Sequence, residues 1–374
     1  MNSKIIGILI LVVAISGSSA YFLTKNDSTN VDSSQIESIN QNDKVGLVIN
    51  TINPPENIDD IEQSYRIAST SGIGRTNLYV HWDKLEPEKE NFDWRFTDIM
   101  MKLNQKYNLK TTLFFSVVNA DRLGPFPQWM GNQVIGETLE IETIRVLDEI
   151  LLRYENIDYV IFAGDIDYHL QRAPGTIPNY VEFFNGISTE IKSKHPEVKI
   201  GNTMSLENVL NKGMEPGGSF ELTPQMEMGD FIGISYKPTD TVGDINKTPR
   251  EAFKDLEKTL EIFPSQKLGF FEISWSTSDF VNGNIPDQEQ FIKSSLNFFE
   301  NNESQIEFFT ISRLFDKPKG SCVSIDIENI SGSGFTSNSY RLERIDEYLC
   351  NAGLIDINEN PKPSWNQLKN NIPE

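Results

Sequence analysis

The sequence predicts an α/β fold in which residues 45–374 form a closed (β/α)8 TIM barrel. Eight apolar runs with the composition of β-strands alternate with longer segments of helical character, and successive runs begin about 30 to 50 residues apart. This distance leaves room for one helix and two loops, which is the spacing of βα units in a parallel sheet. Eight units favour a closed barrel over an open doubly wound sheet, because eight parallel strands can pair every edge.

The expected strands are, in chain order, Val45–Ile49, Thr76–Val80, Thr111–Val117, Tyr159–Ala163, Val198–Asn202, Phe231–Tyr236, Leu268–Ile273 and Ile306–Ile311. Between them, apolar residues recur every three or four positions, which predicts amphipathic helices packed on the outside of the sheet. Such faces are formed by Ile58, Ile61, Tyr65 and Ala68, by Phe253, Leu256, Leu260 and Phe263, and by Phe291, Ser295, Phe298 and Phe299. Segment 206–227 contains several glycines and prolines, which predict a short helix or a loop.

The N-terminal residues are expected to lie outside the barrel. Residues 1–23 carry the single cation Lys4, an uncharged apolar stretch and a patch of small residues that ends at Ala20. This pattern is typical of a cleavable signal peptide, and its length also suits an uncleaved membrane anchor. Residues 24–44 have almost no large apolar side chain and are expected to form a disordered, flexible linker. We therefore expect an extracytoplasmic protein that is secreted or tethered to the membrane by its N-terminal segment.

Composition excludes several classes of partner and cofactor. The formal net charge of −21 repels phosphate backbones, so nucleic-acid binding is not expected. No glycine-rich phosphate-binding loop follows any expected strand, so no nucleotide cofactor is predicted. The histidines His81, His169 and His195 have no metal-ligand spacing, and neither do the cysteines, so no metal site is predicted. Cys322 and Cys350 are expected either as a disulfide or as two buried thiols.

Two carboxylates follow apolar strands at the edge where a barrel binds its ligands. Asp165 ends the fourth expected strand and Glu272 lies at the end of the seventh. The carboxyl ends of parallel strands form the ligand-binding mouth, and the fourth and seventh strands of eight face each other across it. A pair of carboxylates that flanks one glycosidic bond is the minimum equipment for glycoside hydrolysis, with one residue as acid and base and the other as nucleophile.

Further motifs make the chain resemble the clan A glycoside hydrolases, a superfamily of mostly retaining barrel enzymes. The most specific match is the second-strand region, with Gly74-Arg75, Trp82-Asp83-Lys84-Leu85-Glu86-Pro87-Glu88 and Phe92-Asp93-Trp94. Other similar segments are Pro127-Gln128-Trp129 after the third strand, 230–236 at the sixth, Phe271-Glu272-Ile273-Ser274-Trp275 at the seventh, and 353–356 with 361–365 near the C-terminus. The resemblance covers most of residues 45–374.

The resemblance implies that Glu272 is the catalytic nucleophile and Asp165 the acid/base, acting on O-glycosidic bonds of oligo- or polysaccharides without a cofactor. Arg75 is expected in the substrate-binding site, where it pairs with Glu272 and keeps it ionised, and Asp167 is an alternative acid in the same site. Flat aromatic rings at the strand ends are expected to line the mouth and stack on sugars. These rings are Trp82, Trp129, Tyr236 and Trp275.

Two departures from the superfamily pattern keep other functions open. The fourth strand ends in Gly164-Asp165 where the superfamily has Asn-Glu, and the eighth ends in Ser312-Arg313 where it has a tryptophan beneath the sugar. A second hypothesis is therefore a catalytically inactive barrel that binds cell-surface glycans. A third is a cell-envelope scaffold without affinity for saccharides. In those cases Glu272 forms a structural ion pair, and Asp165 caps a helix or is a hydrogen-bonded loop carboxylate.

Overall fold

The computed structural model describes residues 40–210, 218–323 and 339–373, and the predicted signal or anchor segment lies outside them. Eight parallel strands form the barrel: β1 Asn42–Leu47, β2 Ile73–Val80, β3 Lys110–Asn119, β5 Ile157–Gly164, β6 Lys199–Ser205, β7 Phe231–Tyr236, β8 Leu268–Ile273 and β9 Ile306–Ile311. The ring closes because β1 pairs with both β2 and β9, while β2 also pairs with β3. The short β4, Arg122–Leu123, pairs antiparallel with β3. The predicted (β/α)8 barrel is confirmed.

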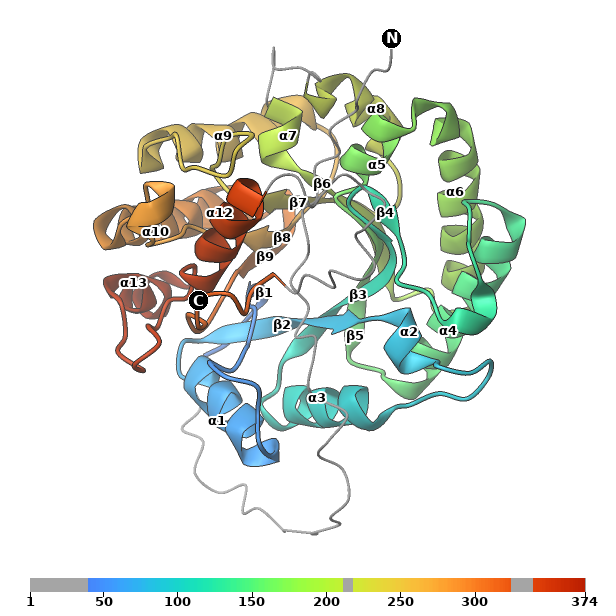
Figure 1. Ribbon diagram of the computed structural model, residues 1–374, viewed down its shortest axis with the longest axis horizontal. Helices are drawn as coiled ribbons and strands as arrows, with labels where there is room; N and C mark the ends of the chain where they lie inside the picture. The colour runs from blue at the N-terminus through green and yellow to red at the C-terminus, as the bar shows by residue number, and fades with distance from the viewer. Residues whose placement is uncertain (1–39, 211–217, 324–338, 374) are drawn as a thin grey trace.

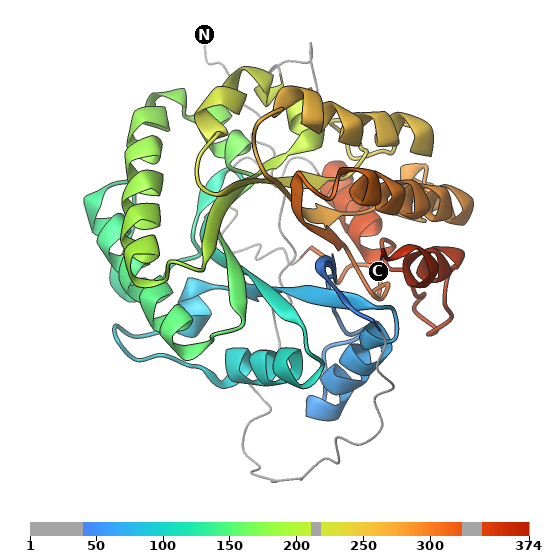
Figure 2. The same ribbon diagram turned by 180° about the vertical axis from the view of Figure 1, so that it is seen from behind.

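Helices surround the ring of strands in both views (Figure 1, Figure 2). The longer ones are α1 Ile58–Ser69, α3 Arg95–Lys106, α4 Glu137–Arg153, α6 Ile177–Lys194, α9 Pro249–Ile262, α10 Ile285–Asn302, α12 Ser339–Cys350 and α13 Pro363–Asn371. The described ranges also contain the short α-helices α2 Trp82–Leu85, α5 Ile166–Arg172, α7 Leu206–Leu210 and α8 Thr223–Met226. Single 3-10 turns are η2 Gln128–Met130, η3 Pro174–Thr176, η4 Ser219–Leu222 and η5 Asp279–Val281. No helix within the described ranges is long and apolar enough to span a bilayer.

Local sequence explains where the helices begin and which faces they bury. Capping boxes start α1 and α9. The N-cap residue is Asn57 in α1 and Thr248 in α9, and its partner in the first turn is Asp60 or Glu251 respectively. The predicted apolar face of α10 is buried, as expected. In α1 the prediction holds except at Ile58, which is 47% exposed because it is the first residue of the helix. Segment 206–227 contains only short helices where it is described, as its glycines and prolines predict.

Aromatic side chains fill the interior of the barrel near the N-terminal ends of its strands and surround one buried arginine. Arg75, near the start of β2, donates to Asp158 at the start of β5 over 2.8 Å. Its guanidinium also stacks on two rings, 4.6 Å from the Tyr159 centroid and 5.5 Å from that of Phe308. All these residues lie near the N-terminal ends of their strands, opposite the mouth. The expectation that Arg75 pairs with Glu272 is therefore wrong.

The C-terminal segment is fastened to the loop that follows β9. Cys322 and Cys350 form a disulfide with a Cα–Cα distance of 5.5 Å, which settles the alternative in favour of pairing. Lys362, just before α13, forms a buried ion pair with Asp316, with 2.8 Å between Nζ and Oδ2. Asp316 also accepts a hydrogen bond from the Gly353 amide. The disulfide joins the end of α12 to this loop, the ion pair joins the residue before α13 to it, and α13 itself packs on α10.

Candidate active site

Glu272 is buried at the mouth end of β8, with 9% of its surface exposed. The Tyr79 hydroxyl, from the end of β2, donates a hydrogen bond to its Oε1. Asn77 supports this tyrosine, because its amide donates to the Tyr79 oxygen over 3.3 Å and to the Phe271 carbonyl over 2.9 Å. Burial raises the pKa of Glu272, and Lys237, the Tyr79 hydrogen bond and Arg313 oppose that rise. The site thus contains groups that favour the ionised carboxylate.

Asp165 occupies a constrained position directly after β5. Its backbone is left-handed, with φ 45° and ψ 45°, and its side chain is 1% exposed. The hydroxyl of Ser235 donates to Oδ1, and that of Thr203 lies 3.4 Å from the same oxygen. Oδ2 is buried without a hydrogen-bond partner. Asp165 stands at the N-cap position of α5 but makes no capping hydrogen bond, so helix capping does not explain it.

The residue before Asp165 has a steric reason to be glycine. A Cβ added at Gly164 would lie 2.6 Å from the ring of Phe114, which belongs to the aromatic cluster inside the barrel. The asparagine found here in the clan A enzymes therefore has no room beside this phenylalanine. Interior packing therefore accounts for the glycine of the Gly164-Asp165 departure and leaves the aspartate unexplained.

One serine connects the two carboxylates. In the parallel register Ser235 of β7 is paired with Glu272 of β8, and its hydroxyl binds Asp165. The charge of Asp165 is also one of the causes that raise the pKa of Glu272. Asp165 and Glu272 therefore both lie at the mouth ends of their strands, near enough for the charge of one to act on the other, and their predicted pairing across one glycosidic bond stays a prediction.

Sequence reasoning missed four charged or polar neighbours of this pair. Lys237 follows β7 directly, and the charges of Glu207, Asp165 and Glu272 raise its pKa against the effect of burial. Glu207, on α7, has its own pKa raised by burial, and Lys237 counteracts that shift. The other two are Tyr79 and Arg313. Each lies at or just beyond a strand end, and that position is the only signal in the sequence that could have identified them.

Three of the predicted sugar-stacking rings belong to the core. Tyr236 is fully buried and donates to Asp255 of α9 over 2.6 Å. It faces the helices because neighbouring strand residues point to opposite sides, and Ser235 already points inward. Trp82 is also fully buried and packs on Phe115. Trp275 is covered by α10, so the expectation that these three rings line the mouth is wrong.

The remaining predicted residues have defined structural contacts. Asp167 is fully buried and accepts hydrogen bonds from the Ser205 amide, the Asn208 side chain and the Ser219 hydroxyl. Burial, followed by the charge of Asp165, raises its pKa to about 7. With both oxygens engaged, Asp167 supports the loop and is not placed to act as the acid. Trp129 is half-buried and donates to the Glu86 carbonyl, and its predicted sugar contact stays a prediction.

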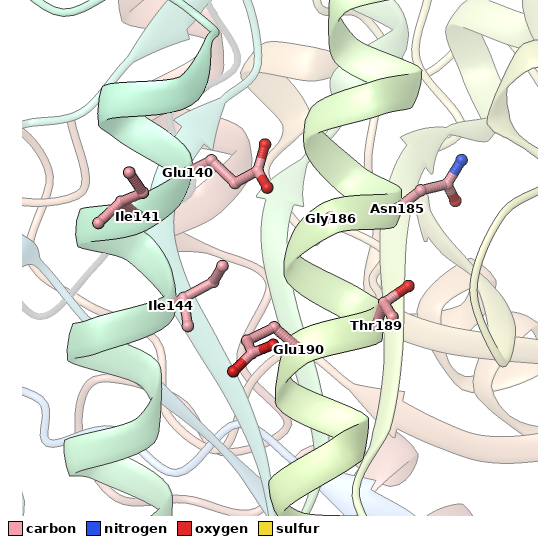
Figure 3. A pocket seen from close by; sticks show the side chains of 7 residues that line it. All are labelled: Glu140, Ile141, Ile144, Asn185, Gly186, Thr189 and Glu190. Carbon is pink, nitrogen blue, oxygen red and sulfur yellow. The ribbon is translucent and has the colours of Figure 1, made fainter.

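A separate groove lies on the outside of the barrel, between α4 and α6 (Figure 3). Its walls include Glu140 and Ile144 from α4 and Glu190 from α6, and it contains none of the predicted site residues. In the part of the chain that the structure describes, one group of metal-ligand types lies close together, namely Cys322, Asp346 and Cys350. Both cysteines are in the disulfide, so this group offers no thiolate to a metal.

Comparison of the sequence with protein-family models and with curated proteins finds no match. Solved structures do match. A GH5_18 protein from Streptomyces cattleya in complex with Manb1-4GlcNAc shares 10% identity over 88% of this chain and 80% of its own, with a TM-score of 0.65. A family 39 glycoside hydrolase from Bacteroides cellulosilyticus has 14% identity, coverages of 90% and 64%, and a TM-score of 0.59.

An exo-beta-1,4-mannosidase from an Opitutaceae bacterium also matches, with 14% identity, coverages of 90% and 61%, and a TM-score of 0.61. At these identities the likeness establishes the fold. The chain has the same (β/α)8 barrel fold as these glycoside hydrolases, which agrees with the resemblance of its motifs. What these proteins bind or cleave belongs to them, and the site of this chain has to be judged on its own residues.

Proposed function

We propose that the protein is a glycoside hydrolase that cleaves O-glycosidic bonds of oligo- or polysaccharides, with Glu272 as nucleophile and Asp165 as acid/base. The observation that supports the proposal is the position of Ser235, whose hydroxyl donates to Asp165 and whose register partner on the neighbouring strand is Glu272. In the first step Glu272 attacks the anomeric carbon while Asp165 protonates the leaving oxygen. In the second, Asp165 removes a proton from water, which releases the sugar from Glu272.

The contacts of the two carboxylates suit these different roles. Glu272 must be ionised to attack; burial raises its pKa, and Lys237, the Tyr79 hydrogen bond and Arg313 favour the charged form against that larger effect. Asp165 must carry a proton on a free oxygen, and Ser235 engages only Oδ1. Oδ2 has no hydrogen-bond partner among the described residues, so it is the oxygen that can exchange a proton with the leaving group.

The test is hydrolysis of a panel of aryl glycosides and polysaccharides by the wild type, Glu272→Gln and Asp165→Asn. We include mannosyl-β-1,4-N-acetylglucosamine, because one structural neighbour binds it. Each variant should lose turnover by at least about 100-fold while still binding saccharide. The control is Glu190→Gln, a carboxamide change in the outer groove that should leave turnover unchanged. Full activity in Glu272→Gln would exclude the assigned nucleophile.

A second candidate function is glycan binding without hydrolysis. The observation that favours it is the enclosure of Asp165, which is 1% exposed and one methylene shorter than the superfamily's glutamate. Loss of the asparagine before it also removes a contact to the sugar that strengthens in the transition state. In this case the wild type binds glycans, measured by calorimetry, and shows no turnover on any member of the panel.

We also propose that the protein works outside the cytoplasm. The Cys322–Cys350 disulfide supports this location, because such bonds persist in oxidising compartments. Fractionation of cells that express the full chain tests it. Recovery in the membrane fraction indicates a retained anchor, recovery in the medium indicates a cleaved signal peptide, and a cytoplasmic protein with both thiols free contradicts the proposal.

A further inference from the structure

Arg313 stands at the mouth without the partners that a buried arginine normally has. It lies two residues after β9 and is 5% exposed. Its guanidinium forms no hydrogen bond or ion pair with any residue in the described ranges, and its Nε is buried and unpartnered. Glu272, Tyr79 and Asp316 influence it only through their charges. A buried guanidinium with free donors leaves a large part of its hydrogen-bonding capacity unused.

The other buried arginine of the barrel shows that the fold can satisfy such a group. Arg75 has a carboxylate, a threonine hydroxyl and two aromatic rings around it. Scarcity of acidic residues does not explain the difference, because the chain has 54 aspartates and glutamates against 33 lysines and arginines. The open donors of Arg313 are therefore a property of this site.

A second cation lies close to Arg313. Lys317, four residues further along the same loop, is half-buried and forms no ion pair with the described residues. Burial lowers its pKa, and the positive charge of Arg313 lowers it further while Asp346 opposes the shift. Lys317 therefore adds positive charge to the loop that carries Arg313. The unpartnered, buried guanidinium of Arg313 remains the observation that points to an anionic ligand.

We propose that Arg313 and Lys317 bind an anionic group on the saccharide, a carboxylate or a sulfate, next to the bond held by Glu272 and Asp165. This inference rests on the proposed function and names its substrate class as acidic sugars. A guanidinium matches the two oxygens of a carboxylate or sulfate with parallel hydrogen bonds, and a lysine adds a point charge. Strand eight ends in Ser312-Arg313 where the clan A pattern has a tryptophan, so this end of the strand offers a charged group and no ring for stacking.

The experiment measures calorimetric binding to the full chain carrying Glu272→Gln, so that no ligand is consumed. The probes are glucuronate-containing oligosaccharides, sulfated oligosaccharides, and the same compounds after carboxyl reduction or desulfation. We expect the charged forms to bind about 10- to 100-fold more tightly than their neutral counterparts, with an advantage that shrinks as salt rises. A preference for one charged series over the other identifies the anionic group.

Variants test which cation is responsible. Arg313→Met should abolish the preference for charged probes, and Lys317→Met should reduce it. The matched control is Lys319→Met, because Lys319 is an exposed lysine of the same loop that already pairs with Glu347. Circular dichroism and thermal melting of each variant show that it is folded. Arg313→Lys tests geometry, since a lysine keeps the charge and loses the paired donors.

The outcomes separate this inference from the proposed function. Equal binding of charged and neutral probes overturns the inference, and so does an equal loss of both in Arg313→Met, which would make Arg313 a general support for Glu272. In either case, hydrolysis of neutral glycosides by the wild-type protein, with Glu272 unchanged, would leave the proposed function intact. Tight binding of charged probes without any hydrolysis supports the acidic-sugar site and contradicts the hydrolase. Binding of neither series overturns both.

Discussion

Replacing Lys362 with methionine should remove a large part of the stability of the barrel. Lys362 and Asp316 are both at least nine-tenths buried, with 2.8 Å between Nζ and Oδ2. At this distance the attraction is about 6 kcal/mol for an effective dielectric constant of 20, and much of it offsets the desolvation of the two charges. Lys362→Met leaves Asp316 buried and uncompensated, so the free energy of unfolding should fall by about 3–5 kcal/mol at pH 7.

The pH dependence identifies the cause of this loss. Burial already raises the pKa of Asp316, and removal of Lys362 raises it further. A carboxyl with a raised pKa in the folded state gives up stability as pH rises through that pKa, so the deficit of Lys362→Met should shrink in acid. Urea unfolding at pH 7 and pH 5, followed by circular dichroism, measures both effects. The double variant Lys362→Met/Asp316→Asn should recover part of the loss. A deficit below about 1 kcal/mol, or one independent of pH, would refute the reasoning.

Three further predictions follow from the site and the disulfide. Lys237→Met should raise the pKa of Glu272, so the acid limb of the kcat/KM profile on a hydrolysed glycoside moves to higher pH; an unchanged limb contradicts the electrostatic role. Replacing Cys322 and Cys350 with serine opens a loop with a sequence separation of 28, so the free energy of unfolding measured in urea should fall by about 3.5 kcal/mol. An unchanged free energy of unfolding would mean that the disulfide does not form in solution. Asp167 has a folded-state pKa of about 7, so its contribution to stability is present below pH 3.8 and lost as pH rises through 7. Stability measured against Asp167→Asn should fall over that range, and a parallel pair of pH curves would contradict it.

The fold could be predicted from the sequence because its strands are short, apolar and separated by turn residues. β7, β8 and β9 begin and end at the residues predicted for them. The other strands differ by a few residues at their ends, where a buried barrel strand continues through polar positions such as Thr203 and Ser205 that carry no apolar signal. Tertiary pairing decides those ends, and an apolar pattern does not contain it.

The site could be predicted only in part. The sequence points to Asp165 and Glu272 because a carboxylate at the end of an apolar strand is unusual. Tyr236 and Trp275 were misplaced because the direction of a side chain depends on strand register, which a fully apolar run does not reveal. Arg75 precedes the predicted run Thr76–Val80, so its place at the base of the barrel could have been inferred from that order alone.

The contacts around Arg75 stabilise the end of the barrel that lies opposite the candidate site. The guanidinium, its carboxylate partner Asp158 and the stacked rings secure the closed end without help from any residue at the rim. Substitutions at Asp165 or Arg313 therefore leave the contacts at the base of the barrel in place. A redesign of those two positions can keep the base unchanged, whereas the Lys362–Asp316 ion pair on the mouth side has to be preserved.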